Sequence, residues 1–233
     1  MGSQIRADGQ TSRMGRAAES PRSLRETRQR DLVRATRALF DARGMQHAPI
    51  EEVARTVGIA RGLVYRQFSS KEELFVLTVT DYLDELVPLL EEAIAGTRRP
   101  ARRLAACTEA FARFCARYPA FLDCTMSLMQ RPARELRAMV SEAVWLQLGQ
   151  GMSAGLTPVA DVLRQGAESG DFAIGDPEYT ANVLWVQALG IMHLVRIGVG
   201  VRQAAPGVPA LFSVDDERLI ATCVDSALAC VGG

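Results

Sequence analysis

Residues 58–74 read GIARGLVYRQFSSKEEL, and this stretch carries the strongest local pattern in the chain. Gly58 ends one apolar periodic segment, and Val64 and Phe68 then lie one helical turn apart. Apolar residues at this spacing predict a short helix over residues 61–68 that buries one face and leaves the other exposed.

A second short helix is predicted immediately before it, because apolar residues follow the i, i+3, i+4, i+7 spacing at Ile50, Val53, Ala54 and Val57. Two short helices joined by a glycine-containing turn form the helix-turn-helix unit, whose second helix enters the major groove of DNA. The outward positions of that helix include no acid and suit phosphates and base edges; they are Arg61, Gly62, Leu63, Tyr65, Arg66 and Gln67. On periodicity alone, a plain helical hairpin is the alternative.

Two further helix starts carry the spacing of a capping box, in which a serine is followed three residues later by a glutamate. Ser70 with Glu73 predicts a long helix after Ser70, and Ser23 with Glu26 predicts that the first helix begins after Ser23. Gly44 is expected to end that first helix.

Residues 58–74 resemble the signature of the TetR family of bacterial transcriptional regulators, G-[VI]-S-[KR]-G-[TA]-[LIV]-Y-x-[HY]-F-x-[SN]-K-[ED]-x-L. The first two helices of that family are matched by Ala38-Leu39-Phe40 with Gly44, and by Val53-Ala54. The resemblance covers Arg25 to about Leu74. The remaining two-thirds of the chain resembles the family only in length and in its helical pattern.

The resemblance implies a DNA contact for several residues of this sequence. Arg61 stands where the family has a cation that contacts a phosphate or a base, and Tyr65 and Lys71 stand where it contacts the DNA backbone. Arg66 and Gln67 stand where side chains often reach base edges. An arginine that bonds O6 and N7 of guanine is worth about 1–3 kcal/mol of discrimination between bases.

The sequence departs from the family pattern at three places in this region. Ala60 replaces the serine that usually caps the recognition helix, a cap worth about 1 kcal/mol. Leu63 replaces a common threonine, and Ala48-Pro49 replaces Thr-Ser before the second helix. The departures keep a second hypothesis open, namely a helical protein that binds an apolar ligand and has lost specific DNA binding.

The net charge of this 233-residue chain is zero, but the charges are divided unevenly along it. Residues 1–71 contain fourteen Lys and Arg against seven Asp and Glu, and residues 72–233 contain thirteen against twenty. A basic segment next to an acidic one indicates contact with nucleic acid or membrane through the basic part, with a solvated arginine-rich surface as the alternative.

The whole chain is predicted to be all-α, because no sustained period-2 alternation indicates a sheet. Residues 1–22 are predicted to be a flexible arginine-rich arm, residues 23–71 a three-helix helix-turn-helix domain, and residues 72–233 a helical effector-binding and dimerisation domain. Further helices are predicted at Pro100–Tyr118, Pro119–Gln130, Arg134–Leu148, Pro158–Ser169, Pro177–Val199 and Asp215–Val231.

The resemblance implies an effector pocket in the acidic two-thirds, and large, soft side chains in its helices suit an apolar cavity. The candidate ligand-binding residues are Phe111, Phe114, Cys115, Met126, Met129, Trp145 and Trp185. Each of them, taken singly, fits an ordinary core position as well. Candidate polar anchors are Tyr82, Asp123, Gln187 and His193.

The last two predicted helices are apolar on more than one side, and in the resembled family they pair with their symmetry mates. This implies a homodimer on a palindromic operator, with recognition helices about 34–36 Å apart. Together these features predict a ligand-responsive repressor that a small, largely apolar effector releases from double-stranded DNA.

Several other classes are disfavoured by the sequence. It has two histidines and no motif of a hydrolase, a P-loop or a dinucleotide site, so neither an enzyme nor a metal or cofactor site is expected. The five cysteines indicate free thiols in a reducing cytoplasm. Val183–Val201 is long enough to span a bilayer, but Gln187, His193 and Arg196 interrupt it, and a helix buried in a core and a subunit interface is predicted instead.

Overall fold

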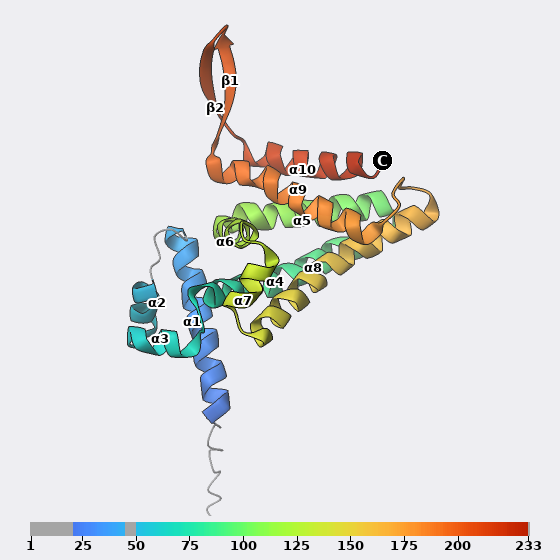
Figure 1. Cartoon of the computed structure of the whole chain (residues 1–233). Coiled ribbons are helices and arrows are strands. Elements are labelled where there is room, and N and C mark those ends of the chain that lie inside the picture. The colour runs from blue at the N-terminus through green and yellow to red at the C-terminus, as the bar shows by residue number, and fades with distance from the viewer. Residues whose placement is uncertain (1–20, 45–49, 233) are drawn as a thin grey trace, which may run out of the picture.

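The computed structural model describes residues 21–44 and 50–232. The first three helices are α1 (Pro21–Arg43), α2 (Ile50–Val57) and α3 (Arg61–Gln67). They pack on one another as the helix-turn-helix unit at one end of the molecule (Figure 1). The predicted arm of residues 1–22 lies outside the described residues except for its last two, which belong to α1, and Ala48-Pro49 lies outside them too.

The expected start of the first helix was wrong. Helix α1 already includes Pro21, so Ser23 and Glu26 lie inside the helix rather than at a capping box. Proline is tolerated in the first turn of a helix, where its missing N–H has no partner to lose.

The rest of the chain is helical apart from one hairpin, and the predicted all-α class is confirmed. The larger part consists of α4 (Lys71–Ala95), α5 (Pro100–Arg117), α6 (Pro119–Met129), α7 (Ala133–Met139), α8 (Glu142–Ser169), α9 (Pro177–Ile197) and α10 (Asp216–Cys230). The start predicted after Ser70 is confirmed, because the Ser70 hydroxyl accepts a hydrogen bond from the backbone N–H of Glu73 at 3.0 Å.

The predicted division between Arg134–Leu148 and Pro158–Ser169 was wrong. The chain breaks earlier, at Val140 and Ser141, and α8 then continues through Pro158 to Ser169. Proline inside a helix removes one backbone hydrogen bond. Helix α8 packs against α4, α5 and α9, and this tertiary packing outweighs the local cost.

The expectation of no sheet was also wrong. Strands β1 (Val199–Ala205) and β2 (Val208–Ser213) form an antiparallel hairpin between α9 and α10. Gly198, with φ of +73°, ends α9, and Pro206 with Gly207, at φ of +76°, makes the turn. Figure 1 shows the hairpin projecting past α10, away from the helical body.

One apolar core connects the helix-turn-helix unit to the rest of the molecule. It runs from Leu32 in α1 and Val64 in α3, through Leu74 in α4, to Met192 in α9. Helix α4 packs against α1, α5, α6 and α8, so it is the element that both parts of the molecule share.

In the described part of the chain, α9 is the one helix long and apolar enough to cross a bilayer. Only 28% of its most apolar 18-residue stretch is buried, yet it packs on α5, α6, α8 and α10. A single helix of this kind is weak evidence for a membrane span, because core helices reach the same composition.

Two glycines of α8 predict opposite effects of the same substitution. A Cβ on Gly166 would lie 2.0 Å from the ring of Phe172, whereas a Cβ on Gly149 would meet nothing within 4 Å. Gly166→Ala should therefore lower the free energy of unfolding by about 1–3 kcal/mol. Gly149→Ala should raise it by up to about 1 kcal/mol through helix propensity. Urea denaturation of both variants checks this, and a shift of the same sign in both would contradict it.

Candidate functional site

Helix α3 has a buried face and an outward face, as its periodicity predicts. Val64 and Phe68, which follows the helix as its C-cap, are 1% and 4% exposed and belong to the core. Most of the predicted DNA-contacting residues are exposed, namely Arg61, Gly62, Tyr65, Arg66 and Lys71. The other two, Leu63 and Gln67, are half-buried, and the Gln67 side-chain oxygen is buried without a hydrogen-bond partner.

The outward face of α3 carries an ion pair that the sequence analysis missed. Arg61 Nη1 lies 2.8 Å from Oε1 of Glu51, which comes from α2. Arg61 also donates to the Tyr65 hydroxyl at 3.4 Å, and this bond and the Glu51 charge raise the pKa of the guanidinium. The sequence of α3 contains no acid, and the packing of α2 on α3 brings Glu51 to this surface.

The N-terminus of α3 lacks a side-chain cap, as Ala60 in the sequence predicts. Ala60 has the extended backbone of an N-cap residue, with φ of −67° and ψ of 141°, but makes no capping hydrogen bond. At the start of the next helix, Lys71 Nζ lies 4.9 Å from the centre of the Phe75 ring. Lys71 is therefore exposed and lies against a ring of its own helix, α4.

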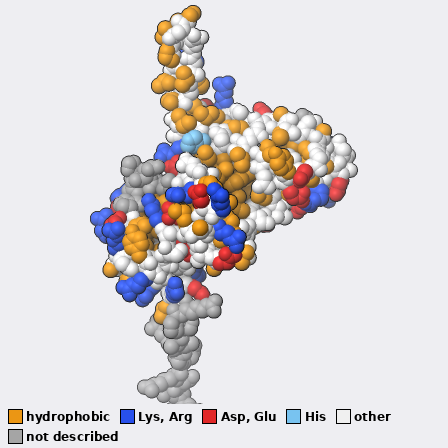
Figure 2. All heavy atoms as spheres, viewed as in Figure 1, with side chains coloured by type: hydrophobic (Ala, Val, Ile, Leu, Met, Phe, Trp, Pro, Cys, Tyr) orange, Lys and Arg blue, Asp and Glu red, His pale blue; other side chains and the backbone are white. Residues whose placement is uncertain are grey.

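Basic side chains gather on this part of the molecule. On the face seen in Figure 2, blue Lys and Arg side chains cluster over the α1–α3 end, next to segments drawn in grey. A surface of this kind attracts the phosphate backbone of nucleic acids.

Arg37 joins the helix-turn-helix unit to the helical domain. Its guanidinium, on α1, is 15% exposed and donates to Asp81 Oδ2 at 2.9 Å and to the Glu85 carboxylate, both on α4. Burial disfavours the charged form of Arg37, but its bonds to Asp81 and Glu85 outweigh this effect and raise its pKa. The group stays a cation at every pH at which the protein is folded.

Two tyrosines complete this contact. The guanidinium lies 4.1 Å from the ring centre of Tyr82 and 4.9 Å from that of Tyr118. The Tyr82 hydroxyl donates to Asp41 of α1 at 2.6 Å, and the Tyr118 hydroxyl donates to Glu85 at 2.7 Å. Burial first, and then the bond to Asp41, raise the pKa of Tyr82, so its phenol stays protonated.

A second junction ties the start of α4 to the start of α8. Glu73 is 4% exposed, and its carboxylate accepts from Ser69 N at 2.6 Å and from Ser141 Oγ at 2.7 Å. Ser70 Oγ donates to the carbonyl of Met139 at 2.6 Å. Glu73 thus bonds Ser69 and Ser141, and not the N–H of Ser70 as a full capping box would.

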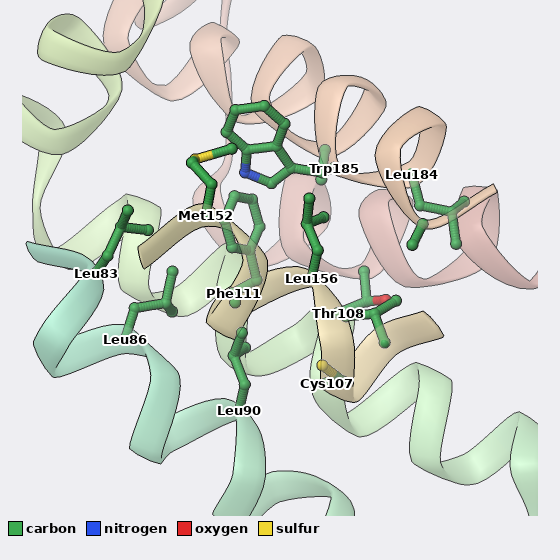
Figure 3. A pocket seen from close by; sticks show the side chains of 14 residues that line it. Leu83, Leu86, Leu90, Cys107, Thr108, Phe111, Met152, Leu156, Leu184 and Trp185 are labelled. Carbon is green, nitrogen blue, oxygen red and sulfur yellow. The ribbon is translucent and has the colours of Figure 1, made fainter. Parts of the chain in front are cut away.

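A cavity lies among α4, α5, α8 and α9. The cavity volume is about 60 Å³, and the cavity is partly open to solvent. Its fourteen lining residues carry no charge; they are Leu83, Leu86, Leu90, Cys107, Thr108, Phe111, Met152, Gly155, Leu156, Val159, Ala181, Leu184, Trp185 and Ala188. Figure 3 shows Trp185 and Met152 close together beside Phe111, with the α4 leucines projecting toward them.

The polar groups on the cavity wall are few. They are the Thr108 hydroxyl, the Cys107 thiol and the indole N–H of Trp185. Burial raises the pKa of Cys107 to about 12, so the thiol is neutral at physiological pH. The wall therefore suits an uncharged apolar molecule with one or two polar groups.

Two of the seven predicted ligand-binding residues, Phe111 and Trp185, line this cavity. The others lie outside its wall; they are Phe114, Cys115, Met126, Met129 and Trp145. Phe114, for example, packs against the rings of Tyr82, Tyr118 and Phe121. The leucines of α4 were missed, although their spacing of three and four residues was a usable signal.

The candidate polar anchors also lie elsewhere. Tyr82 donates to Asp41, and Asp123 accepts from Arg196 Nε at 3.0 and 3.1 Å. Gln187 and His193 are half-buried and do not line the cavity, and His193 Nδ1 is buried without a partner. Across the described ranges 21–44 and 50–232, no three His, Cys, Asp or Glu side chains are grouped to hold a metal ion.

Residues 32–77 match the family model described as bacterial regulatory proteins, tetR family. The chain is 33% identical over 90 residues to the HTH-type transcriptional activator FasR of Mycolicibacterium smegmatis, covering 39% of this chain and 41% of FasR. It is 31% identical over 115 residues to the HTH-type transcriptional regulator HbdR of Aromatoleum sp., and the match covers 49% of this chain and 48% of HbdR. The chain thus spans less than half the length of these two relatives.

A longer match is to the HTH-type transcriptional repressor KstR2 of Mycobacterium tuberculosis, at 27% identity over 153 residues, 63% of this chain and 70% of KstR2. Among solved structures, RolR in complex with resorcinol has a TM-score of 0.65 at 18% identity, covering 91% of this chain and 90% of that one. These relatives are named as regulators, in agreement with the expectation that the chain is not an enzyme.

The Arg37 contact predicts a loss of stability that an exposed ion pair does not share. Arg37→Met leaves Asp81 and Glu85 without their cation, and should lower the free energy of unfolding by about 2–4 kcal/mol. Arg113→Met is the matched control, because Arg113 pairs with Glu217 in solvent and its loss should change little. Urea denaturation measures both, and equal losses would contradict the assignment.

Proposed function

Because this chain belongs to the TetR family of bacterial regulatory proteins, we propose that it is a DNA-binding transcriptional regulator controlled by a small apolar effector. The observation that carries the proposal is the exposed basic face of α3, backed by the buried Val64 and Phe68. A helix held in this way has one face free for the major groove.

In the proposed complex, exposed residues of α3 and of the start of α4 divide into two roles. Lys71, Arg61 and Tyr65 contact phosphates, which fixes the register of the protein on the duplex. Arg66 reaches a base edge, where a guanine offers two acceptors to its guanidinium. Glu51 already neutralises part of the charge of Arg61, so the net contribution of Arg61 is smaller than that of Lys71.

We propose that the protein binds a palindromic operator as a homodimer and resides in the cytoplasm. The dimer is supported by the exposed apolar side chains of α9, which include Val183 and Val186 at 37% and 48% exposure. Two recognition helices related by a two-fold axis read two half-sites about 34–36 Å apart.

The proposed effector site is the cavity among α4, α5, α8 and α9. Its uncharged lining excludes a ligand whose charge would have to be buried inside it, because an unpaired buried charge is costly. The proposed effector is therefore neutral in the part that enters, and the Thr108 hydroxyl is the polar group best suited to orient it.

Two connections couple this cavity to the DNA-binding face. Helix α4 lines the cavity with three leucines and holds Arg37 of α1 through Asp81 and Glu85. Helix α8 also lines the cavity, and Ser141 at its N-terminus bonds Glu73 beside α3. An effector that separates α4 from α8 changes the placement of both α3 helices in the dimer and shifts the population away from the DNA-bound state.

The proposed outcome of DNA binding is repression, as in the name of KstR2, although FasR is named as an activator. The second candidate function, an apolar-ligand-binding protein without specific DNA binding, is supported by the uncapped Ala60 and the Arg61–Glu51 pair. The two candidates differ in one measurable property: only the regulator should slow the migration of a specific DNA fragment in a gel.

A gel-shift titration with the DNA upstream of the chain's own gene and neighbouring genes tests DNA binding. Lys71→Ala should weaken binding to all sequences similarly and reduce the salt slope by about one. Arg66→Ala should cost about 1–3 kcal/mol on the specific site alone. Arg113→Ala, on α5, is the control and should bind as wild type.

The outcomes of that titration separate the hypotheses. No retardation of any such fragment at low salt would rule out the regulator. Equal losses on specific and random DNA for Arg66→Ala would remove its role as a base reader.

A second prediction concerns the cavity. Gly155 lines it, and Gly155→Leu should fill part of the space, whereas Gly149→Leu, on the same helix, points to open space. With the neutral fluorescent dye N-phenylnaphthylamine as probe, Gly155→Leu should raise the Kd at least about tenfold, equivalent to about 1.4 kcal/mol. Gly149→Leu should leave the Kd unchanged. Unaltered dye binding in both variants would place the ligand elsewhere.

A further inference from the structure

The β1–β2 hairpin presents apolar side chains to solvent on one face. Val201 and Leu211 are directly opposite each other in the antiparallel register, and they are 70% and 65% exposed. Val199, two residues before Val201 and therefore on the same face, is 39% exposed. Soluble proteins rarely leave such a group of aliphatic side chains uncovered unless it meets a partner.

The opposite face is apolar as well. The ring of Phe212 lies over Gly200, its cross-strand partner, where a Cβ would come within 2.3 Å of the ring. Phe212 is nevertheless 42% exposed. Arg202 is the one charged residue in the sequence of the two strands, so the hairpin has little to offer an acidic or polyanionic partner.

The hairpin receives little support from its own chain. Val214 N donates to Gly198 O at 3.2 Å at its base, and its main contacts outside the two strands are with α9. A two-stranded hairpin alone in water is marginally stable, and it needs another surface to cover one face.

An apolar stripe on α9 leads directly to this hairpin. Its exposed members recur at spacings of three or four residues, or a multiple of them, and are Tyr179, Val183, Val186, Leu194 and Ile197. Ile197 is 52% exposed and stands two residues before β1. The stripe and the hairpin therefore follow each other along the chain as two uncovered apolar surfaces.

We propose that the hairpin is an arm that packs against a second copy of this chain, an inference that rests on the proposed dimer through α9. Each copy carries one arm and one stripe. In a dimer with a two-fold axis, the arm of each copy contacts the other copy, so every contact occurs twice. In Figure 1 the hairpin extends past α10, on the side away from α5. A copy packed over α9 and α10 meets the arm on that side.

The arm adds buried area to the dimer without adding charge. Burial of aliphatic side chains favours association, so replacing two of them by polar side chains should raise the dimer Kd at least about tenfold.

Sedimentation equilibrium of the full chain from nanomolar to micromolar concentration tests the arm. The double variant Val201→Ser, Leu211→Ser should raise the dimer Kd at least about tenfold. Leu146→Ser, which removes a 59% exposed leucine from α8, is the control and should leave the Kd unchanged. Val186→Asp, in the stripe, should produce a monomer.

The outcomes separate the arm from the dimer on which it rests. A dimeric wild type whose Kd is unchanged in the double variant would overturn the arm and leave the proposed dimer intact. A wild type that is monomeric at all concentrations would overturn both.

Hydrogen exchange of the unmodified chain provides a measurement that does not depend on the folding of variants. Amides of β1 and β2 should exchange more slowly at concentrations where the dimer forms than where it dissociates. Exchange that is independent of concentration, or protection that appears only with phosphatidylcholine–phosphatidylglycerol vesicles, would overturn the arm.

Discussion

The half-buried guanidinium of Arg37 makes the contact on which the relation between the two parts of the molecule depends. The guanidinium of this α1 residue binds the carboxylates of Asp81 and Glu85 on α4. The rings of Tyr82 and Tyr118 lie against the guanidinium plane. The guanidinium is 15% exposed, so a loss of alignment leaves its charge with fewer partners than it would have in water. The angle between α1 and α4 is therefore defined by electrostatics as well as by packing.

Helix α4 connects this contact to the cavity because it is rigid and has different chemistry on its two sides. Its leucines face the cavity, and its acids face α1. The aromatic rings continue the connection, since Tyr82 packs on Phe121, and Phe121 packs on Phe111 of the cavity wall. In the proposed regulator, a ligand acts on packed side chains that have few alternative arrangements, which favours a discrete change of state over a gradual one.

The parts of the structure that the sequence predicted depend on local rules. Val64 and Phe68 place α3, and Ser70 places the start of α4, because periodicity and capping act within a few residues. The Glu51–Arg61 pair and the cavity leucines required knowledge of how helices cross, which the sequence does not contain. The hairpin was missed because its strands have short apolar runs interrupted by Gly200 and Pro209, and because α9 was expected to continue to Val199.

The carboxylate of Glu51 next to Arg61 has a consequence for how such a protein searches a genome. In the proposed regulator, Glu51 already neutralises part of the charge that Arg61 offers to any phosphate, so Arg61 adds little free energy on random DNA. Residence of the proposed regulator on wrong sites is then short, while the proposed operator adds base contacts. In that proposal the acid reduces the time lost on competing sequences, which far outnumber any operator.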